Sequence, residues 1–469
     1  MAKEFEQLQE KLLHENKNGF SCINEKEKEE IYAYCEEYRQ FISQAKTERE
    51  VCEEAYRILE KNGFSPLSAK EKLIPGDKVY TTNRGKGILA AVIGTEPISA
   101  GVHLVGAHID APRLDLKPRP LYEDGGLAFF KTHYYGGIKK YQWTTIPLAI
   151  HGVAALQDGT QIKLSIGEDP EDPVFVITDL LPHLATEQMQ KKLNEGIAGE
   201  ALNLVLGNIS IGDDSVKEGV KLNVLKLLNE KYDITEEDLI SSEIEIVPAF
   251  KARDTGLDRS MIAGYGQDDR VCAYGALRAI LDVKKPAKTA VCLLVDKEEI
   301  GSMGNTGMQS RNYENILARI AYLKEGTESS LLVRDALSNS VCLSADVGVA
   351  FDPNYPDVTE RRNTAIVNGG VMITKYTGSR GKGGASDARA ELMAHVRKLF
   401  NENDVKWQVG ELGKVDMGGG GTIAQFVANL DMDVVDVGVP LLSMHSPYEI
   451  AGKLDIYMAF KGYRAFFRA

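Results

Sequence analysis

The sequence lacks both a long hydrophobic run and a framework of paired cysteines. Its first residues, MAKEFEQLQEKLLHENKN, are charged and amphipathic, unlike the uninterrupted apolar segment of a signal peptide or a membrane span. The six cysteines stand singly without a CxxC pair, which favours reduced, buried thiols over disulfides. We therefore expect a cytoplasmic protein that does not bind membranes.

Basic residues are also fewer than acidic ones. Lys and Arg number 55 against 68 Asp and Glu, which gives a formal net charge of −13 at pH 7. Nucleic-acid binding is not expected, because it requires clustered Lys and Arg. The segment GSRGKGG lacks P-loop spacing, and the G-x-G-x-x-A match from Gly419 to Ala424 follows no clear strand. The glycines at 418–421 favour a tight turn, with main-chain amides facing a substrate as the alternative.

The chain has 469 residues, 43% of them hydrophobic, which is enough for two packed domains. Helix-period apolar positions up to about residue 63, beginning with Phe5, Leu8 and Leu12, predict packing helices. Further on, apolar runs such as TAVCLLVD, SVCLSADV and VVDVGVP alternate with helical stretches such as DRVCAYGALRAIL and SDARAELMAHVRKLF. This alternation predicts an α/β fold with a mixed, largely parallel sheet covered by helices.

A β-rich segment interrupts that pattern. The runs IPLAIHGVA, TQIKLSI, PVFVITDLL and EIEIVPAF predict strands of an inserted domain. We expect the first part of the main domain at 1–117, the inserted β-rich domain at 118–247 and the second part of the main domain at 248–469.

Candidate metal ligands fall where strand-like runs end. His108 ends VHLVGAH, Glu299 follows CLLVD, Asp346 ends CLSAD and His445 closes VVDVGVPLLSMH. The carboxyl ends of strands in an open α/β sheet converge on one crevice, so distant residues can meet there. Taken singly, His108, Asp346 and His445 are better explained as structural residues.

Carboxylates extend this pattern. Asp110 forms an H-x-D pair with His108, which suits a metal-binding imidazole whose other nitrogen is held by a carboxylate. Asp268 and Asp269 open a predicted helix, where one carboxylate can bridge two cations and the other can contact the helix amides. An ordinary N-cap explains Asp268 better when it is considered alone.

Glu298 and Glu299 form an adjacent acidic pair after the apolar TAVCLLV run. Neighbouring carboxylates repel each other unless metal or solvent relieves them. One can bind metal while the other serves as base, and a solvated acidic turn explains the pair equally well.

The last helix is expected to start at Ser446, with Pro447 in its first turn and Glu449 completing a capping box. Several histidines are expected to be ordinary surface or core residues: His14, His103, His133, His151 and His395.

Six motifs follow one another along the chain: GAHIDAPRLDLKP, QDDRVC, DKEEIGS, SADV, DPNYP and SMHSPYE. Together they resemble the aspartyl aminopeptidase family of co-catalytic zinc metallopeptidases, from about residue 20 to the C-terminus. The resemblance implies a zinc-dependent aminopeptidase, a hydrolase that removes N-terminal residues, acidic ones among them, from peptides. It also implies two zinc ions per subunit, with cobalt or manganese as alternatives.

The resemblance assigns the metal ligands. It implies that His108 and Asp346 bind one metal, that Glu299 and His445 bind the other, and that Asp268 bridges the two.

It also assigns neighbouring residues. Glu298 is implied to be the general base, and Asp110 is implied to orient His108. The peptide between Asp268 and Asp269 is implied to be cis.

The family's inserted domain mediates dimerisation, and its members assemble into closed tetrahedral dodecamers in which a PHLA-type histidine reaches a neighbouring active site. This chain carries that motif with His183 as its histidine. The resemblance thus implies a homo-dodecamer built from dimers, with His183 contacting substrate in trans. An ordinary loop histidine is an equal alternative.

Two departures from the family pattern leave the substrate preference open. Val349 and Asp352 stand where many members carry histidines. The segment KYTGSRGKGGASDA also differs, and Lys375, Tyr376 and Arg380 are candidate contacts for an acidic side chain or a carbonyl oxygen. A solvated basic loop explains those three better.

Two alternative functions are considered. One is a related di-metal enzyme, such as a deblocking or glutamyl aminopeptidase or a deacylase. The other is a non-enzymatic, metal-stabilised assembly protein. The spare carboxylate of Glu298 favours an enzyme, because a closed structural zinc site needs no base.

Overall fold

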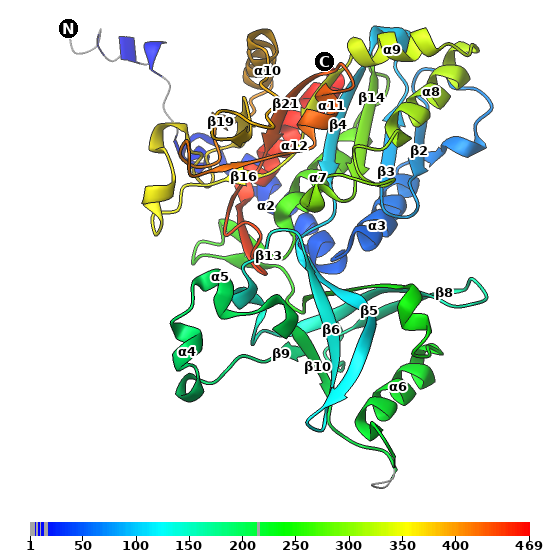
Figure 1. The fold of residues 1–469 in the computed structure, drawn as a ribbon. Helices are drawn as coiled ribbons and strands as arrows, with labels where there is room; N and C mark the ends of the chain where they lie inside the picture. Colours follow the sequence, from blue (N-terminus) through cyan, green and yellow to red (C-terminus); the bar gives the residue numbers. More distant parts are fainter. Residues whose placement is uncertain (1–4, 6–7, 10, 14–16, 213–215) are drawn as a thin grey trace.

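The computed structural model describes residues 5, 8–9, 11–13, 17–212 and 216–469. A nine-stranded sheet with its helices occupies the upper part of Figure 1, and a seven-stranded sheet occupies the lower part. Within the described residues, no helix is both long and apolar enough to cross a membrane.

The nine-stranded sheet is mixed, with a parallel centre. Strands β14, β4, β15 and β21 run parallel to one another, whereas β2, β3 and β17 supply the antiparallel pairings. The predicted α/β fold with a largely parallel sheet is confirmed. The spatial order is β1 (Ser65–Pro66), β2 (Lys78–Thr82), β3 (Ile88–Val92), β14 (Thr289–Val295), β4 (Val102–His108), β15 (Val341–Ser344), β21 (Asp433–Gly438), β17 (Val371–Thr374) and β19 (Trp407–Val409).

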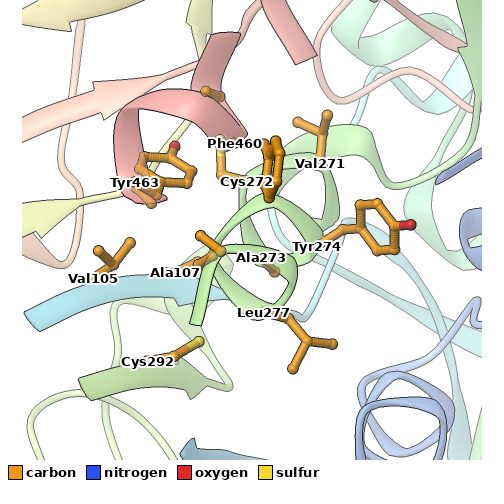
Figure 2. Close-up of a cluster of buried hydrophobic side chains, with 14 of the residues drawn as sticks. Val105, Ala107, Val271, Cys272, Ala273, Tyr274, Leu277, Cys292, Phe460 and Tyr463 are labelled. Atoms are coloured by element: carbon orange, nitrogen blue, oxygen red, sulfur yellow. The ribbon is translucent and has the colours of Figure 1, made fainter. Parts of the chain in front are cut away.

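Helices cover both faces of this sheet, because its buried strands are apolar on both sides. On one face, Val105 and Ala107 of β4 pack against α7 and α12, as Figure 2 shows, and on the other Leu104 packs with α8 and α9. The first face carries α2 (Glu25–Gln44), α3 (Glu48–Lys61), α7 (Gln267–Leu281), α10 (Ala390–Glu402) and α12 (Lys453–Arg468). The second carries α8 (Asn312–Glu325), α9 (Ser330–Ser338) and α11 (Ala424–Ala428).

The seven-stranded sheet is antiparallel and has its own core. β5 crosses the boundary expected at residues 117 and 118, and β11 ends at Pro248. The helix α6 (Gly219–Tyr232) and the short helices α4 (Thr186–Met189) and α5 (Leu193–Gly196) accompany the strands. The spatial order is β8 (Gln161–Ile166), β7 (Leu148–Ala155), β11 (Ser242–Pro248), β5 (Arg113–Asp124), β6 (Leu127–Tyr135), β10 (Asn203–Gly207) and β9 (Val176–Ile177).

The expected start of the last helix at Ser446 is wrong. Glu449–Gly452 forms strand β23, which pairs with β13 (Met261–Gly264), and α12 begins only at Lys453. The strand belongs to a small sheet whose other members are β12 (Arg253–Thr255), β22 (Pro440–Leu442) and β16 (Gly348–Val349). Sheet pairing therefore overrides the local capping signal. A separate two-stranded sheet consists of β18 (Gly378–Ser379) and β20 (Gly419–Gly420).

Two smaller expectations have mixed outcomes. Five cysteines are free and buried, as predicted, but Cys22 is exposed. The N-terminal side chains of Phe5, Leu8 and Leu12 are exposed. The apolar side chains Ile31, Tyr34, Tyr38 and Ile42 of α2 pack into the core.

Candidate metal centre

The five predicted ligands meet at the carboxyl ends of the central strands. His108 is the last residue of β4, Asp346 follows β15, and Glu299 lies in a single turn just after β14. His445 lies between β22 and β23, and Asp268 lies in the first turn of α7. Parallel strands converge at this edge, so side chains far apart in sequence come together there.

Asp268 lies between the two imidazoles. Its Oδ1 is 3.1 Å from Nε2 of His108, and its Oδ2 is 3.1 Å from Nε2 of His445. Oε2 of Glu299 lies 3.5 Å from Nε2 of His445. One carboxylate thus faces a different histidine with each of its oxygens, which is the arrangement that a bridging ligand requires.

The donor atoms fall into two groups that share His108. One group contains His108, Asp268 and Glu299, and the other contains His108, Asp269 and Asp346, with the ligand atoms of each group within 4.8 Å of one another. Imidazole nitrogens and carboxylate oxygens are the donors of catalytic zinc sites.

The centre contains more buried carboxylate than its two histidines can balance. Burial raises the pKa of Glu299 and of Asp346 well above the usual range, and Asp268 and Asp269 respectively add to the effect. Oε1 of Glu299 has no hydrogen-bond partner among the described residues. Burial also disfavours ionised Asp268, but hydrogen bonds from His108 and His445 outweigh it and lower its pKa. The residues present therefore fit a divalent cation, whose charge would balance theirs.

Asp110 holds the first part of the centre in place. Its Oδ1 lies 3.2 Å from Nδ1 of His108 and accepts a hydrogen bond from the backbone N–H of Glu298 at 3.1 Å. Its Oδ2 accepts hydrogen bonds from the backbone N–H of Glu299 at 3.2 Å and from the hydroxyl of Tyr135 at 2.8 Å. Such contacts orient a ligand and fix its tautomer.

Glu449, which is not among the site residues predicted from the sequence, holds the second part of the centre in place. Its Oε1 accepts a hydrogen bond from the backbone N–H of His445 at 2.8 Å. Its Oε2 accepts from the backbone N–H groups of Gln267 at 2.6 Å and Asp268 at 3.2 Å. His445 has a φ of +64°, and this backbone contact stabilises a conformation that non-glycine residues seldom adopt. The only sequence signal for Glu449 is its place in SMHSPYE.

Glu298 lies beside the ligand cluster. Its Oε2 is 3.9 Å from Nε2 of His108, and burial raises the pKa of Glu298 to about 7. The peptide between Asp268 and Asp269 is cis, as the resemblance implied. The expected contact of Asp269 with helix amides is wrong, because neither of its carboxylate oxygens has a hydrogen-bond partner among the described residues.

A cavity of about 480 Å³ opens beside the cluster. Glu298, Glu299, Asp346 and His445 line it, and the Gly419–Gly421 backbone forms part of its wall. None of the described residues that line it is Lys or Arg. The neutral side chains that line it are Val347, Val349, Met372, Thr374, Thr377, Leu412, Thr422, Gln425, Phe426 and Met444.

The four predicted substrate contacts do not line this cavity within one chain. Lys375 forms an ion pair with Asp387, and the hydroxyl of Tyr376 donates a hydrogen bond to Glu411 at 2.6 Å. Arg380 and Tyr376 line an adjoining hollow, which shares Thr374, Thr377 and Leu412 with the cavity. The fourth contact, His183, is exposed in a short turn beside the seven-stranded sheet.

The histidines assigned to ordinary structure behave as expected where they are described. His103 and His151 are buried, and His133 and His395 are exposed. His14 lies outside the described residues.

Comparison with known proteins identifies the family of the chain. The family model described as aminopeptidase I zinc metalloprotease (M18) matches residues 41–467. A Clostridium acetobutylicum protein named "Probable M18 family aminopeptidase 1" is 53% identical over 459 residues, which cover 97% of this chain and 98% of that protein.

Solved structures agree with the family assignment. The crystal structure of an M18 family aminopeptidase from Thermotoga maritima matches with a TM-score of 0.94 and 50% identity, covering 97% of this chain and 100% of that one. The mApe1 dodecamer of Saccharomyces cerevisiae shares the fold, with a TM-score of 0.74 and 22% identity over 92% of this chain and 95% of that one. The predicted zinc metallopeptidase family is confirmed. The chain belongs to the M18 family of zinc metalloproteases and is an aminopeptidase, a hydrolase that removes N-terminal residues from peptides.

Proposed function

We propose that the centre holds two zinc ions, with cobalt or manganese as alternative metals. His108 and Asp346 bind one ion, Glu299 and His445 bind the other, and Asp268 bridges them. The observation that carries this proposal is the placement of Asp268, whose two oxygens each lie 3.1 Å from a different imidazole.

In this proposal, Glu298 is the general base. When bound, zinc would supply Lewis acidity for the hydrolysis of the peptide bond. Glu298 accepts the proton of the attacking water and transfers it to the leaving amine. Asp110 accepts hydrogen bonds from the backbones of Glu298 and Glu299, so the base and its neighbouring ligand keep a fixed relative position.

The cavity supports a substrate class for the reaction. Apart from the metal centre, its wall consists mainly of apolar and hydroxyl side chains, with the buried carboxylate of Asp436 among them. An acidic substrate side chain would meet no Lys or Arg among the described lining residues. The site is therefore selective for peptides whose N-terminal residue is neutral and apolar rather than acidic.

Self-association is part of the same proposal. The segment 180–193 beside the seven-stranded sheet exposes five large apolar side chains, and large exposed apolar patches mark interaction surfaces. These side chains are Leu180, Leu181, Leu184, Met189 and Leu193. Residues 118–247 then act as an inserted dimerisation domain of a homo-dodecamer and present His183 to a neighbouring copy. The yeast relative is a dodecamer. Five buried free thiols support a reducing, cytoplasmic location.

Metal removal tests the proposal. The purified protein is freed of metal with a chelator and titrated with zinc, while release of N-terminal residues from Leu-, Lys-, Asp- and Glu-terminated peptides is followed. Activity should vanish with the metal, return at two equivalents of zinc and be highest on the Leu peptide. Full activity without metal, or saturation at one equivalent, would contradict two catalytic ions. Native mass spectrometry of the same sample measures the assembly.

A further inference from the structure

A three-residue segment at the end of β6 reaches the metal centre from the seven-stranded sheet. Tyr135, the last residue of the strand, donates a hydrogen bond from its hydroxyl to Oδ2 of Asp110 at 2.8 Å. The guanidinium of Arg113 lies over the Tyr135 ring at 3.9 Å from its centroid. Arg113 is itself held by Asp115 at 2.7 Å and by Glu245 at 3.2 Å. The hydroxyl is thus aimed at Asp110 by a buried, fixed environment.

The Tyr135 hydroxyl acts on the centre through Asp110. The carboxylate of Asp110 has only two oxygens, and the structure gives them contacts with His108 and with the backbone N–H groups of Glu298 and Glu299. Without the hydroxyl, the carboxylate loses a side-chain contact that limits its rotation. Tyr135 is therefore a positioning residue, because it touches neither the ligand cluster nor the cavity wall.

The next two residues contact the other side of the centre. Gly136 has a φ of +72°, and a Cβ added there would lie 3.3 Å from Cβ and Oε2 of Glu299. The carbonyl of Gly137 accepts a hydrogen bond from Nδ1 of His445 at 2.9 Å. That bond places the proton on Nδ1 and leaves Nε2 free to face Asp268 and Glu299.

We propose that the segment Tyr135–Gly137 is a clamp through which the seven-stranded sheet sets the metal affinity of the centre. It fixes Asp110, limits the space beside Glu299 and selects the tautomer of His445. This inference rests on the proposed function for the identity of the ligands. Loss of an outer contact of this kind typically weakens metal binding by about 10–100-fold.

The test compares Tyr135→Phe with Tyr134→Phe. Tyr134 is the preceding residue of the same strand and is 43% exposed, so the control removes a hydroxyl that does not reach the centre. Zinc affinity is measured by competition with a chromophoric chelator, and kcat and KM are measured at saturating zinc. Tyr135→Phe should bind zinc at least about tenfold more weakly, with KM little changed and with the melting temperature of the metal-free protein unchanged. Tyr134→Phe should match the wild type.

Three further variants test how the effect reaches the centre. Gly136→Ala introduces strain and a close contact with Glu299, and should weaken zinc binding as well. Asp110→Asn alone and combined with Tyr135→Phe should give non-additive losses, because the hydroxyl acts through that carboxylate.

The outcomes separate this inference from the proposed function. Wild-type zinc affinity in Tyr135→Phe, or losses that simply add with those of Asp110→Asn, would overturn the clamp while two zinc ions in the wild type stand. A wild-type protein that fails to bind two equivalents would instead refute the proposed function.

Discussion

Nδ1 of His151 lies 2.9 Å from Oε1 of Glu50, and this buried contact joins the seven-stranded sheet to helix α3. Nε2 of the same ring lies 3.0 Å from Oε1 of Glu168, which also forms an ion pair with Lys46. Burial opposes a charged imidazole here, but the hydrogen bonds to Glu168 and Glu50 outweigh it and raise the pKa of His151. Below that raised pKa both ring nitrogens donate, and the ring then links α3 to the seven-stranded sheet.

This contact predicts a pH-dependent stability. A histidine whose pKa is raised above its ordinary 6.5 stabilises the fold fully below that value, and the contribution is lost as the pH rises through the folded-state pKa. His151→Gln should therefore lower the free energy of unfolding most below about pH 6.5, with a smaller difference in alkaline solution. Urea unfolding over a series of pH values measures this. His395→Gln, at an exposed site, is the control, and a difference that grows with pH would contradict the prediction.

Under the proposed function, Glu298 and Glu299 have different roles, so their variants should show two different defects. Glu298→Gln should lower kcat by about 10²–10⁴-fold and leave two zinc ions bound, because the variant lacks only the proton acceptor. Glu299→Gln should reduce bound zinc, because it alters a ligand. Metal analysis beside steady-state kinetics distinguishes the two, and an empty site in Glu298→Gln would assign that residue to the ligands.

Glu449→Ala should destabilise the fold and the centre together. The side chain is 1% exposed and accepts hydrogen bonds from three backbone N–H groups, so its removal leaves buried donors unpaired. Each such donor costs about 1–3 kcal/mol, and the free energy of unfolding should fall by about 3 kcal/mol or more. Denaturant unfolding of the metal-free protein is the measurement, with Glu402→Ala at the exposed end of α10 as its control. A change below about 1 kcal/mol would show that these amides find other partners.

Asp436→Asn should relax the discrimination against acidic substrates. Asp436 is 3% exposed and lines the cavity, and burial raises the pKa of Asp436 to about 6, so the group carries a negative charge above that pH. Removing the charge should raise kcat/KM for a Glu-terminated peptide relative to a Leu-terminated peptide by roughly tenfold at pH 8, which corresponds to about 1.4 kcal/mol. Asp433→Asn, at the start of the same strand, should leave the ratio unchanged. An unaltered ratio in Asp436→Asn would place the substrate side chain elsewhere.

The positions of the candidate ligands can be predicted from the sequence for a physical reason. His108, Glu299 and Asp346 each follow an apolar run, and the ends of parallel strands must share one edge of the sheet. Each of these residues, taken alone, is weak evidence for a metal ligand. The six motifs in their order along the chain indicate that the residues belong to one site. The predicted cis peptide at Asp268 came from the resemblance alone.

The residues that hold the candidate ligands in place cannot be predicted from the sequence in the same way. Glu449 looked like part of a helix cap, and only its pairing in β23 brings its carboxylate to the amides around Asp268. Tyr135 ends β6, whereas Asp110 lies in the connection between β4 and β5, so no local pattern links the two. Lys375 is a candidate substrate contact in the sequence, but in the folded chain it forms an ion pair with Asp387.

The shared carboxylate of Asp268 has a consequence for how this enzyme can change. In the proposed two-zinc centre, Asp268 serves both cation positions at once and ties their geometries together, so neither position can be changed to bind another metal by itself. Variants with altered metal preference should therefore carry paired changes on both sides of Asp268, and partial loading should leave the remaining position misaligned.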